Sequence, residues 1–388
     1  MLRSPPAELL ARVAAGDAAA RTAASQWMRR QLVDGPTAST PSITTRLPFP
    51  YHWIPTRVRM RVRDAMVARW FGRLRGAPRF PDYYADNGLD AVASAAGGAG
   101  PAWSWPEGHQ CALMLSHDVD TGTEHEQVRA FADLARSLGL RSTFMFVGDH
   151  VGRYADLCHE LLADGFEVGL HDVVHDNRIA WLGEDAVVDR LRPWLERWQG
   201  ALGVRGFRSP SWYVSPALWR GLRRAGLAYD CSVQDTNMMQ EGDRNVGAAT
   251  YFPYMVGDLV VLPSTIPFDE LPWAIGVEPS ATATFWQAKI DHVAATGGVM
   301  VVNAHPSPWF CGNTAGRDAL RTCLEQIVSR HAPWCATGRQ IEAHVRREAE
   351  RGAMATLTGE PPIGVPRHGR EIRLGGLATN PVTRAWRS

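Results

Sequence analysis

Lysine is nearly absent from this chain of 388 residues, because Lys289 is its single representative and arginine supplies almost all of the basic charge. We attribute this bias to codon usage in a GC-rich genome. The 41 basic residues nearly balance 40 acidic ones, and we find no localised basic stripe beyond Arg346-Arg347. Proteins that bind nucleic acid polymers need clustered basic residues to neutralise phosphates. The composition therefore argues against a nucleic acid partner.

Long apolar segments and closely spaced cysteines are missing as well. No run approaches the ~20 apolar residues that span a bilayer. Residues 10–25 are interrupted by Arg12, Asp17 and Arg21, so we expect no secretory signal. The six cysteines lie at positions 111, 158, 231, 311, 323 and 335 without any Cys-x-x-Cys spacing, which is typical of buried thiols in a reducing compartment. Together these absences predict a cytoplasmic protein.

Two short polar motifs follow apolar runs and supply the pieces of a metal site. Asp118 and Asp120 end the run that starts with residues 112–115, and alternation along an extended chain places both carboxylates on the same side. His171 and His175 follow a second apolar run and share one face if the backbone turns helically. Two imidazoles and one carboxylate leave a position open for water, which is the pattern of a catalytic divalent metal.

Each motif alone has a simpler explanation. An Asp-x-Asp pair at a strand end commonly forms a turn or a cap, and many His-x-x-x-His pairs lie on solvated helix faces. The second motif also differs from the zincin motif, because Asp172 stands where a glutamate would be required. What favours a joint metal site is that both motifs directly follow apolar runs.

Further motifs extend this pattern along the chain. They are Trp-Pro-Glu-Gly at 105–108, Arg-Ser-Thr-Phe-Met-Phe at 141–146, Glu-Val-Gly-Leu-His at 167–171 and Gly-Phe-Arg-Ser-Pro at 206–210. In this order they resemble the polysaccharide deacetylase family, which has the NodB homology domain and is also called carbohydrate esterase family 4. The resemblance covers residues 105–345. It implies an irregular (β/α) barrel and a metal-dependent N-deacetylase that hydrolyses the N-acetyl amide of a sugar in a polysaccharide or glycoconjugate precursor.

The same resemblance implies a role for individual residues. Asp118 would be the general base, Arg208 would orient it, and His305 would be the general acid. Three side chains would hold one divalent ion: Asp120, His171 and His175. Such a ligand set suits zinc, which we expect, and also Co, Ni, Mn or Fe.

The chain departs from the family pattern in two places. Val119 separates two aspartates that are adjacent in the commonest first motif, as in a branch that includes some peptidoglycan deacetylases and allantoinase-like amidohydrolases. The aspartate that supports the catalytic histidine has no clear match, and Asp230 and Asp235 are both candidates. The substrate therefore stays open between a sugar and a small non-sugar amide. A non-catalytic sugar-binding barrel is a third alternative, but it would not need the complete set of catalytic and metal-binding residues.

Aromatic residues beside the motifs predict where a sugar would bind. The candidates for substrate binding are Pro210, Trp212, Tyr213 and Trp309, with core packing as the alternative for the aromatic side chains. A cytoplasmic enzyme meets its substrate before export. We therefore expect an N-acetylated precursor that is linked to a lipid or a nucleotide.

The order of elements predicts three regions: a helical accessory region at 1–100, a deacetylase-like domain at 103–350 and an extended tail at 351–388. In the first region, we expect a helix over 7–32 with a break at Gly16-Asp17. A second helix over 57–75, in which apolar residues alternate with arginines, either packs on the main domain or contacts a membrane surface.

Strands and helices alternate within the central region. We expect helices over 129–138, 154–164, 185–202 and 216–226, and strands over 142–147, 166–170, 259–263 and 299–303. This alternation predicts an α/β fold built from βα units on a parallel sheet. Periodicity alone does not distinguish a barrel from a doubly wound sheet.

Overall fold

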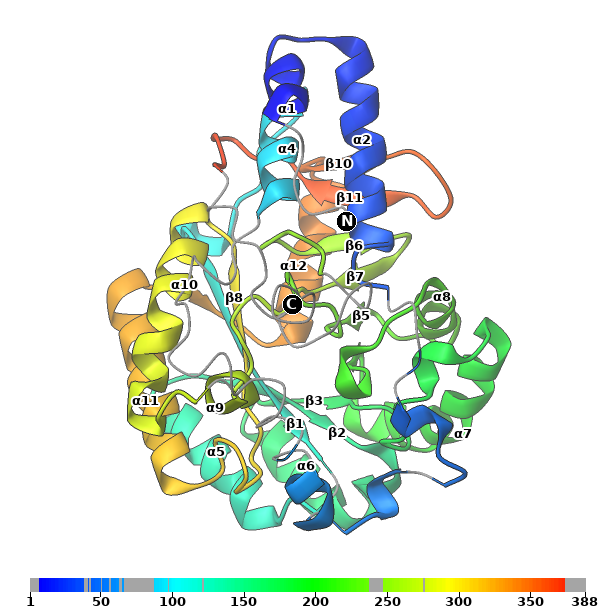
Figure 1. The fold of residues 1–388 in the computed structure, drawn as a ribbon, viewed down its shortest axis with the longest axis vertical. Coiled ribbons are helices and arrows are strands. Elements are labelled where there is room, and N and C mark those ends of the chain that lie inside the picture. The colour runs from blue at the N-terminus through cyan, green and yellow to red at the C-terminus, as the bar shows by residue number, and fades with distance from the viewer. Residues whose placement is uncertain are drawn as a thin grey trace.

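A sheet of eleven strands, most of them parallel, forms the centre of the protein (Figure 1). We describe it from a computed structural model for residues 7–37, 41, 43–49, 51–55, 57–62, 65, 87–96, 98–120, 122–236, 247–274 and 276–373. The strands are β1 (Ala112–Val119), β2 (Ser142–Phe146), β3 (Glu167–Leu170), β4 (Gly206–Phe207), β5 (Tyr229–Asp230), β6 (Tyr254–Val256), β7 (Leu259–Val261), β8 (Val299–Asn303), β9 (Trp334–Cys335), β10 (Met354–Leu357) and β11 (Ile363–Pro366).

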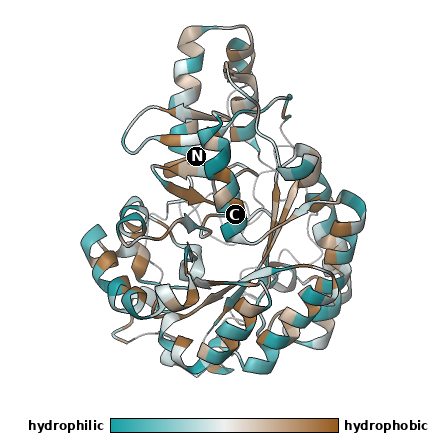
Figure 2. Cartoon of the chain, turned by 180° about the vertical axis from the view of Figure 1, so that it is seen from behind, coloured by the Kyte–Doolittle hydropathy of each residue, from teal (hydrophilic) through white to brown (hydrophobic). Residues whose placement is uncertain are grey.

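Helices surround this sheet, with α5 and α6, α7 and α8, and α10 and α11 lying at successive positions around it (Figure 1). The α-helices of the described residues are α1 (Ala7–Ala14), α2 (Ala18–Val33), α4 (Gly88–Ala96), α5 (His125–Ser137), α6 (Val151–Ala163), α7 (Glu184–Leu202), α8 (Pro216–Arg224), α9 (Glu270–Ala274), α10 (Thr282–Thr296), α11 (Thr314–His331) and α12 (Gly338–Glu350). Figure 2 shows brown, apolar strands inside this ring and largely teal helix surfaces outside it.

The parallel strands are ordered β8-β1-β2-β3-β4-β5-β7, and β6, β11 and β10 continue the sheet in antiparallel pairing. The segment that follows β7 returns to β8 and closes the sheet on itself. Ile266 N donates a hydrogen bond to the Val301 carbonyl (3.2 Å), and the Thr265 hydroxyl donates to the Val299 carbonyl (2.6 Å). The same hydroxyl accepts from Val301 N (2.9 Å). The predicted irregular barrel of α/β type is therefore confirmed.

Every residue of β1 is buried. A strand that is covered on both faces needs a continuous apolar sequence, which is why the runs before the polar motifs were recognisable as strands. The predicted helices and strands of the central region correspond to α5 to α8 and to β2, β3, β7 and β8 with shifts of a few residues. The two-residue strands β4 and β5 are too short to produce a period and were not predicted.

The N-terminal helices α1, α2 and α4 lie together beside β10 and β11 (Figure 1). The predicted break between α1 and α2 occurs where Gly16 adopts a φ of 85°, and Asp17 caps α2 by accepting a hydrogen bond from Ala20 N (3.0 Å). Trp27 and Leu32 of α2 belong to the main hydrophobic core. The accessory helices are therefore packed on the barrel through apolar contacts.

Part of the segment predicted as an extended tail, 351–388, belongs to the sheet. Residues 354–366 contain β10 and β11, which pair with each other and add to the edge of β6. Buried Leu357, Ile363 and Val365 explain this, because burying them offsets the entropy of ordering the hairpin. Residues 374–388 lie outside the described residues.

The second predicted N-terminal helix, over 57–75, is described only in part. Residues 57–62 are helical, whereas 63–64 and 66–75 lie outside the described residues. Val58 and Val62 are exposed on this helical turn. None of the helices that the structure describes is long and apolar enough to cross a membrane.

The Thr265 hydroxyl offers a test of how the barrel closes. Thr265→Val keeps the shape of the side chain but leaves the buried Val301 N–H and Val299 carbonyl without this partner. We expect the free energy of unfolding to fall by about 1–3 kcal/mol in urea denaturation. Thr322→Val on the exposed surface of α11 is the matched control and should change stability much less. Equal effects of the two variants would contradict a closing role for Thr265.

Candidate active site

The predicted site residues meet at the C-terminal ends of four parallel strands. Asp118 and Asp120 come at the end of β1, His171 follows β3, Arg208 follows β4, and His305 lies two residues beyond β8. Ligand sites of (β/α) barrels lie at this end, because the βα loops converge there.

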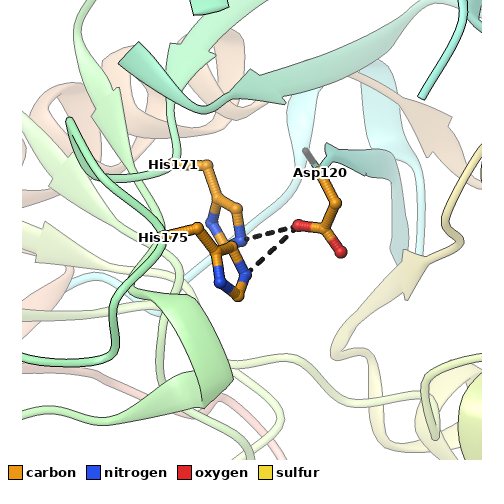
Figure 3. A group of neighbouring side chains, drawn as sticks. All are labelled: Asp120, His171 and His175. Carbon is orange, nitrogen blue, oxygen red and sulfur yellow. Dashed lines mark ion pairs between the residues drawn. The ribbon is translucent and has the colours of Figure 1, made fainter. Parts of the chain in front are cut away.

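Asp120, His171 and His175 face one another in a compact cluster (Figure 3). Asp120 Oδ1 lies 3.5 Å from His171 Nε2 and 3.2 Å from His175 Nε2, and the three potential ligand atoms all lie within 4.8 Å of one another. His171 Nδ1 donates to the Arg208 carbonyl at 2.9 Å, so a neutral ring carries its proton there and presents a lone pair at Nε2. Asp120 Oδ1 is buried without a hydrogen-bond partner.

This donor set fits a divalent ion. Ligand atoms about 2.0–2.1 Å from a tetrahedral ion are separated from one another by about 3.4 Å, and the separations of Asp120 Oδ1 from the two Nε2 atoms are 3.2 and 3.5 Å. Two imidazole lone pairs and a carboxylate oxygen at this distance repel one another unless positive charge lies between them. Although burial favours a neutral ring, Asp118 and Asp120 raise the pKa of His171. Without a metal, the same cluster therefore favours a protonated His171 ring.

The loop that carries both histidines is held by Arg190 of α7 and not by helical structure, so the histidines converge without the helical turn that would place them on one face. Residues 171–176 contain no helix, and Asp172 has a φ of 57°, which is strained for a residue with a Cβ. Arg190 donates to both oxygens of Asp172 (2.7 and 2.9 Å), to Asp176 (2.8 and 3.1 Å) and to the Val174 carbonyl (2.7 Å). This network stabilises the strained turn between the two histidines.

Asp118 is an ionised carboxylate in a dry environment. Its Oδ1 accepts from Arg208 Nη1 (2.8 Å) and its Oδ2 accepts from Asn303 Nδ2 (3.0 Å). Burial alone favours the neutral acid, but the charge of Arg208 is the chief opposing effect and lowers the pKa of Asp118 to about 2. Arg208 has no exposed surface and also donates to Asn303 Oδ1 at 2.7 Å. Asn303, the last residue of β8, was not predicted as a site residue.

Asp269 supports His305, which corrects both aspartates suggested from the sequence. Asp269 Oδ1 lies 2.7 Å from His305 Nδ1, and Oδ2 accepts from His305 N at 2.8 Å. Asp230 instead accepts from Trp219 Nε1 (2.8 Å), and Asp235 pairs with Lys289 (2.6 Å). Asp269 follows β7 by a loop and lies 36 residues before the histidine, so no local spacing indicated it.

The charge of His305 is controlled by this carboxylate. Burial favours a neutral imidazole, but Asp269, followed by Asp118 and Asp120, raises the pKa of His305 to about 10. His305 Nε2 lies 3.7 Å from Asp118 Oδ2, so the protonated ring and the ionised carboxylate face each other. One group can therefore deliver a proton while its neighbour accepts one.

Among the predicted aromatic residues, only Trp309 offers a large free surface, with 43% exposed. The Arg208 guanidinium carbon lies over the Trp212 ring, 4.9 Å from the ring centre, and the same ring packs against Phe268. Tyr213 packs against Trp181 in the hydrophobic core. This burial favours the alternative of core packing for the Trp212 and Tyr213 rings. Pro210 is buried as well and begins a short 3-10 helix over Pro210–Trp212.

A residue from the N-terminal region also reaches the cluster. Tyr51, in a short 3-10 helix over Tyr51–Trp53, places its hydroxyl 2.5 Å from His175 Nδ1. Burial raises the pKa of Tyr51, so the phenol stays neutral. No local pattern indicated this contact, because the two residues are 124 positions apart.

Comparisons with known proteins identify the fold. Neither a protein-family model nor a curated protein matches the sequence. Among solved structures, a protein assigned as a polysaccharide deacetylase from Mycobacterium smegmatis is 22% identical with a TM-score of 0.50, and the match covers 65% of this chain and 96% of that one. The chain has the polysaccharide deacetylase fold.

Two other solved structures agree with that fold. An allantoinase matches with 14% identity and a TM-score of 0.52, over 64% of this chain and 94% of that one. A protein assigned as a polysaccharide deacetylase from Pseudomonas aeruginosa PAO1 matches with 15% identity and a TM-score of 0.52, over 64% and 95% of the two chains. About a third of this chain therefore has no counterpart in these proteins.

The Asp269–His305 pair predicts a measurable titration. In metal-free protein, NMR should give a His305 pKa of about 10 and a lower value in Asp269→Asn, because the neutral amide no longer favours the imidazolium. His344, which bonds to the Ser104 carbonyl, is the internal control and should titrate alike in both proteins. An unchanged His305 pKa in the variant would refute the assignment.

The same shift has a consequence for stability. The folded pKa of about 10 lies above the ordinary value of 6.5, so this contribution is complete below pH 6.5 and is lost as the pH rises to 10. The difference in unfolding free energy between the wild type and Asp269→Asn should therefore shrink across that window.

Proposed function

We propose that the protein is a metal-dependent amide hydrolase that removes the N-acetyl group of a sugar in a polysaccharide or glycoconjugate precursor. The observation that carries the proposal is the arrangement of Asp120, His171 and His175, whose ligand atoms surround one point. Beside them lie Asp118, whose pKa the Arg208 charge lowers to about 2, and His305, whose pKa Asp269 raises to about 10. A site with these groups contains what hydrolysis of an unactivated amide needs.

Asp120, His171 and His175 would hold the ion, and we expect zinc. A divalent ion at this position would acidify a bound water and polarise the acyl carbonyl. Asp118 would take a proton from the attacking water, and Arg208 and Asn303 would keep its carboxylate ionised and fixed. As the C–O bond forms and the C–N bond breaks, His305 would protonate the departing nitrogen. The products would be a carboxylate and a free amine.

The enclosure of the site bears on the size of the substrate. Asp118 and His171 are each 2% exposed and His305 is 8% exposed, so the reacting groups lie below the surface. An acyl group on a terminal sugar could enter end-on, with exposed Trp309 as the ring that contacts the sugar. The interior of a long polymer would fit less well. This enclosure also supports a second candidate, hydrolysis of a small non-sugar amide.

A substrate panel distinguishes the two candidates. Acetate release should be measured from free, nucleotide-linked and lipid-linked N-acetyl sugars. In parallel, cleavage should be measured with small linear and cyclic amides. Turnover confined to the small amides would replace the deacetylase assignment while leaving the hydrolase proposal intact. Metal-loaded protein that hydrolyses none of these amides would contradict the proposed function.

Two substitutions separate metal binding from base catalysis. His171→Ala should yield folded protein with little bound zinc, because a three-ligand site loses a ligand. Asp118→Asn should keep zinc, but its rate of amide hydrolysis should fall by a factor of about 10² to 10⁴, because the asparagine side chain cannot accept the proton. Asp133→Asn, on the surface of α5, is the matched control for the second change. Metal content and hydrolysis rate are measured for each. Full zinc in His171→Ala, or near wild-type turnover in Asp118→Asn, would contradict the corresponding role.

Contact with a membrane surface would fit a lipid-linked substrate. Within the described residues, four of the five exposed large apolar side chains are Phe49, Trp53, Val58 and Val62. Arg57 and Arg61 are exposed on the same helical turn as Val58 and Val62. Apolar side chains together with arginines suit an anionic lipid surface, where each basic residue contributes roughly 1 kcal/mol.

Liposome sedimentation tests this contact. The protein should sediment with anionic vesicles at low salt, and Arg57→Gln with Arg61→Gln should release it, because salt and charge removal both weaken the attraction. The double control Arg192→Gln with Arg330→Gln removes two exposed arginines elsewhere and should have no effect. Sedimentation that is absent, or insensitive to salt and to the first pair of changes, would exclude this surface as a membrane contact.

A further inference from the structure

The two histidines of the cluster are oriented by different parts of the chain. His171 Nδ1 donates to the Arg208 carbonyl at 2.9 Å, so its ring is fixed from within the barrel. His175 Nδ1 has Tyr51 Oη at 2.5 Å, and the two rings meet edge-on with their centres 5.6 Å apart. The N-terminal region therefore supplies the partner of the second histidine.

The direction of this hydrogen bond follows from the chemistry of the ring. A neutral imidazole that presents a lone pair at Nε2 carries its proton at Nδ1. His175 Nε2 faces Asp120 Oδ1 at 3.2 Å, where an ion would lie. In the metal-binding state, His175 Nδ1–H would thus donate to the Tyr51 oxygen. Partners of this kind fix the tautomer and the ring orientation of metal-ligating histidines.

The segment that carries Tyr51 is attached to the loop that carries His175. Thr44 Oγ1 accepts from Asn177 Nδ2 at 3.1 Å, and the Leu47 carbonyl accepts from Arg178 Nη2 at 2.5 Å. On the C-terminal side of Tyr51 in the sequence, the Arg59 guanidinium lies 5.5 Å from the centre of the Tyr51 ring. The hydroxyl is therefore held next to His175 by contacts on both sides of Tyr51.

We propose that Tyr51 is a positioning residue of the metal site, which makes the N-terminal region a functional part of that site. The inference rests on the proposed metal binding by Asp120, His171 and His175. It goes beyond that proposal because it assigns a role to a residue outside the deacetylase-like region. It also predicts that the barrel residues without the N-terminal segment bind metal less tightly.

Zinc titration by calorimetry of the metal-free protein tests this role without reference to activity. The wild type should bind one ion. Tyr51→Phe keeps the aromatic ring but cannot accept from His175 Nδ1, and its zinc affinity should fall at least tenfold. Tyr254→Phe is the matched control, because it removes the hydroxyl of another buried tyrosine, which donates to the Leu32 carbonyl at 3.3 Å. Its affinity should equal that of the wild type.

A second readout separates positioning from general destabilisation. The visible spectrum of the Co²⁺-loaded protein reports ligand geometry and should change in Tyr51→Phe but not in Tyr254→Phe. Wild-type affinity and an unaltered cobalt spectrum in Tyr51→Phe would overturn the role of Tyr51 while leaving the metal site intact. Equal losses in Tyr51→Phe and Tyr254→Phe would also overturn it, because general destabilisation would then be responsible. Absence of metal binding by the wild type would instead refute the proposed function itself.

Discussion

The buried guanidinium of Arg208 is the interaction on which the rest of the site depends. A charge with no exposed surface is tolerated only when it is paired and hydrogen-bonded. Its N–H groups donate to four partners that come from three different strands or their ends: Asp118, Asn303, Ser116 and the Cys231 carbonyl. Its backbone carbonyl accepts from His171 Nδ1. One residue thereby keeps the carboxylate of Asp118, the proposed base, ionised and fixes the tautomer of His171, a proposed metal ligand. Loss of the guanidinium would leave Asp118 as an unpaired buried carboxylate, a change that typically costs about 3–5 kcal/mol.

How far the sequence predicts this protein depends on whether a residue's signal is local. Strands buried on both faces give continuous apolar runs, so β1, β3 and β8 and the polar residues at their ends could be found. The helix α10 was not predicted, because its exposed stripe carries alanines such as Ala288 and Ala295 while its buried face includes Lys289, so the sequence shows no clear polar face. Asp269 and Tyr51 were missed for a related reason, since each is defined by a partner far away in sequence. For the Trp212 and Tyr213 rings the sequence left sugar stacking and core packing both open, because only packing decides whether an aromatic residue is a binding surface or core.

The N-terminal region changes how the site is understood. Its helices pack on the barrel through the main core, and its following segment reaches the histidine loop through Tyr51, Thr44 and Leu47. The site is therefore bounded by two parts of the chain, and its reacting groups are almost fully buried. Burial strengthens the electrostatic coupling between Asp118, His305 and Asp269. Under the proposed function, it would also favour substrates that present an acyl group at an end. The fold is shared with a polysaccharide deacetylase and an allantoinase, so the walls around the catalytic groups, rather than the barrel, would determine which amide is cleaved.

The most direct test of the central claim is anomalous X-ray diffraction at the zinc edge, from crystals of the full chain grown with zinc. We predict a single strong peak about 2.0–2.2 Å from Asp120 Oδ1 and from Nε2 of His171 and His175, with a water or substrate oxygen completing the coordination. No peak at this position, with the imidazoles hydrogen-bonded directly to Asp120 as protonated rings, would contradict the account. A peak only at another site would contradict it equally.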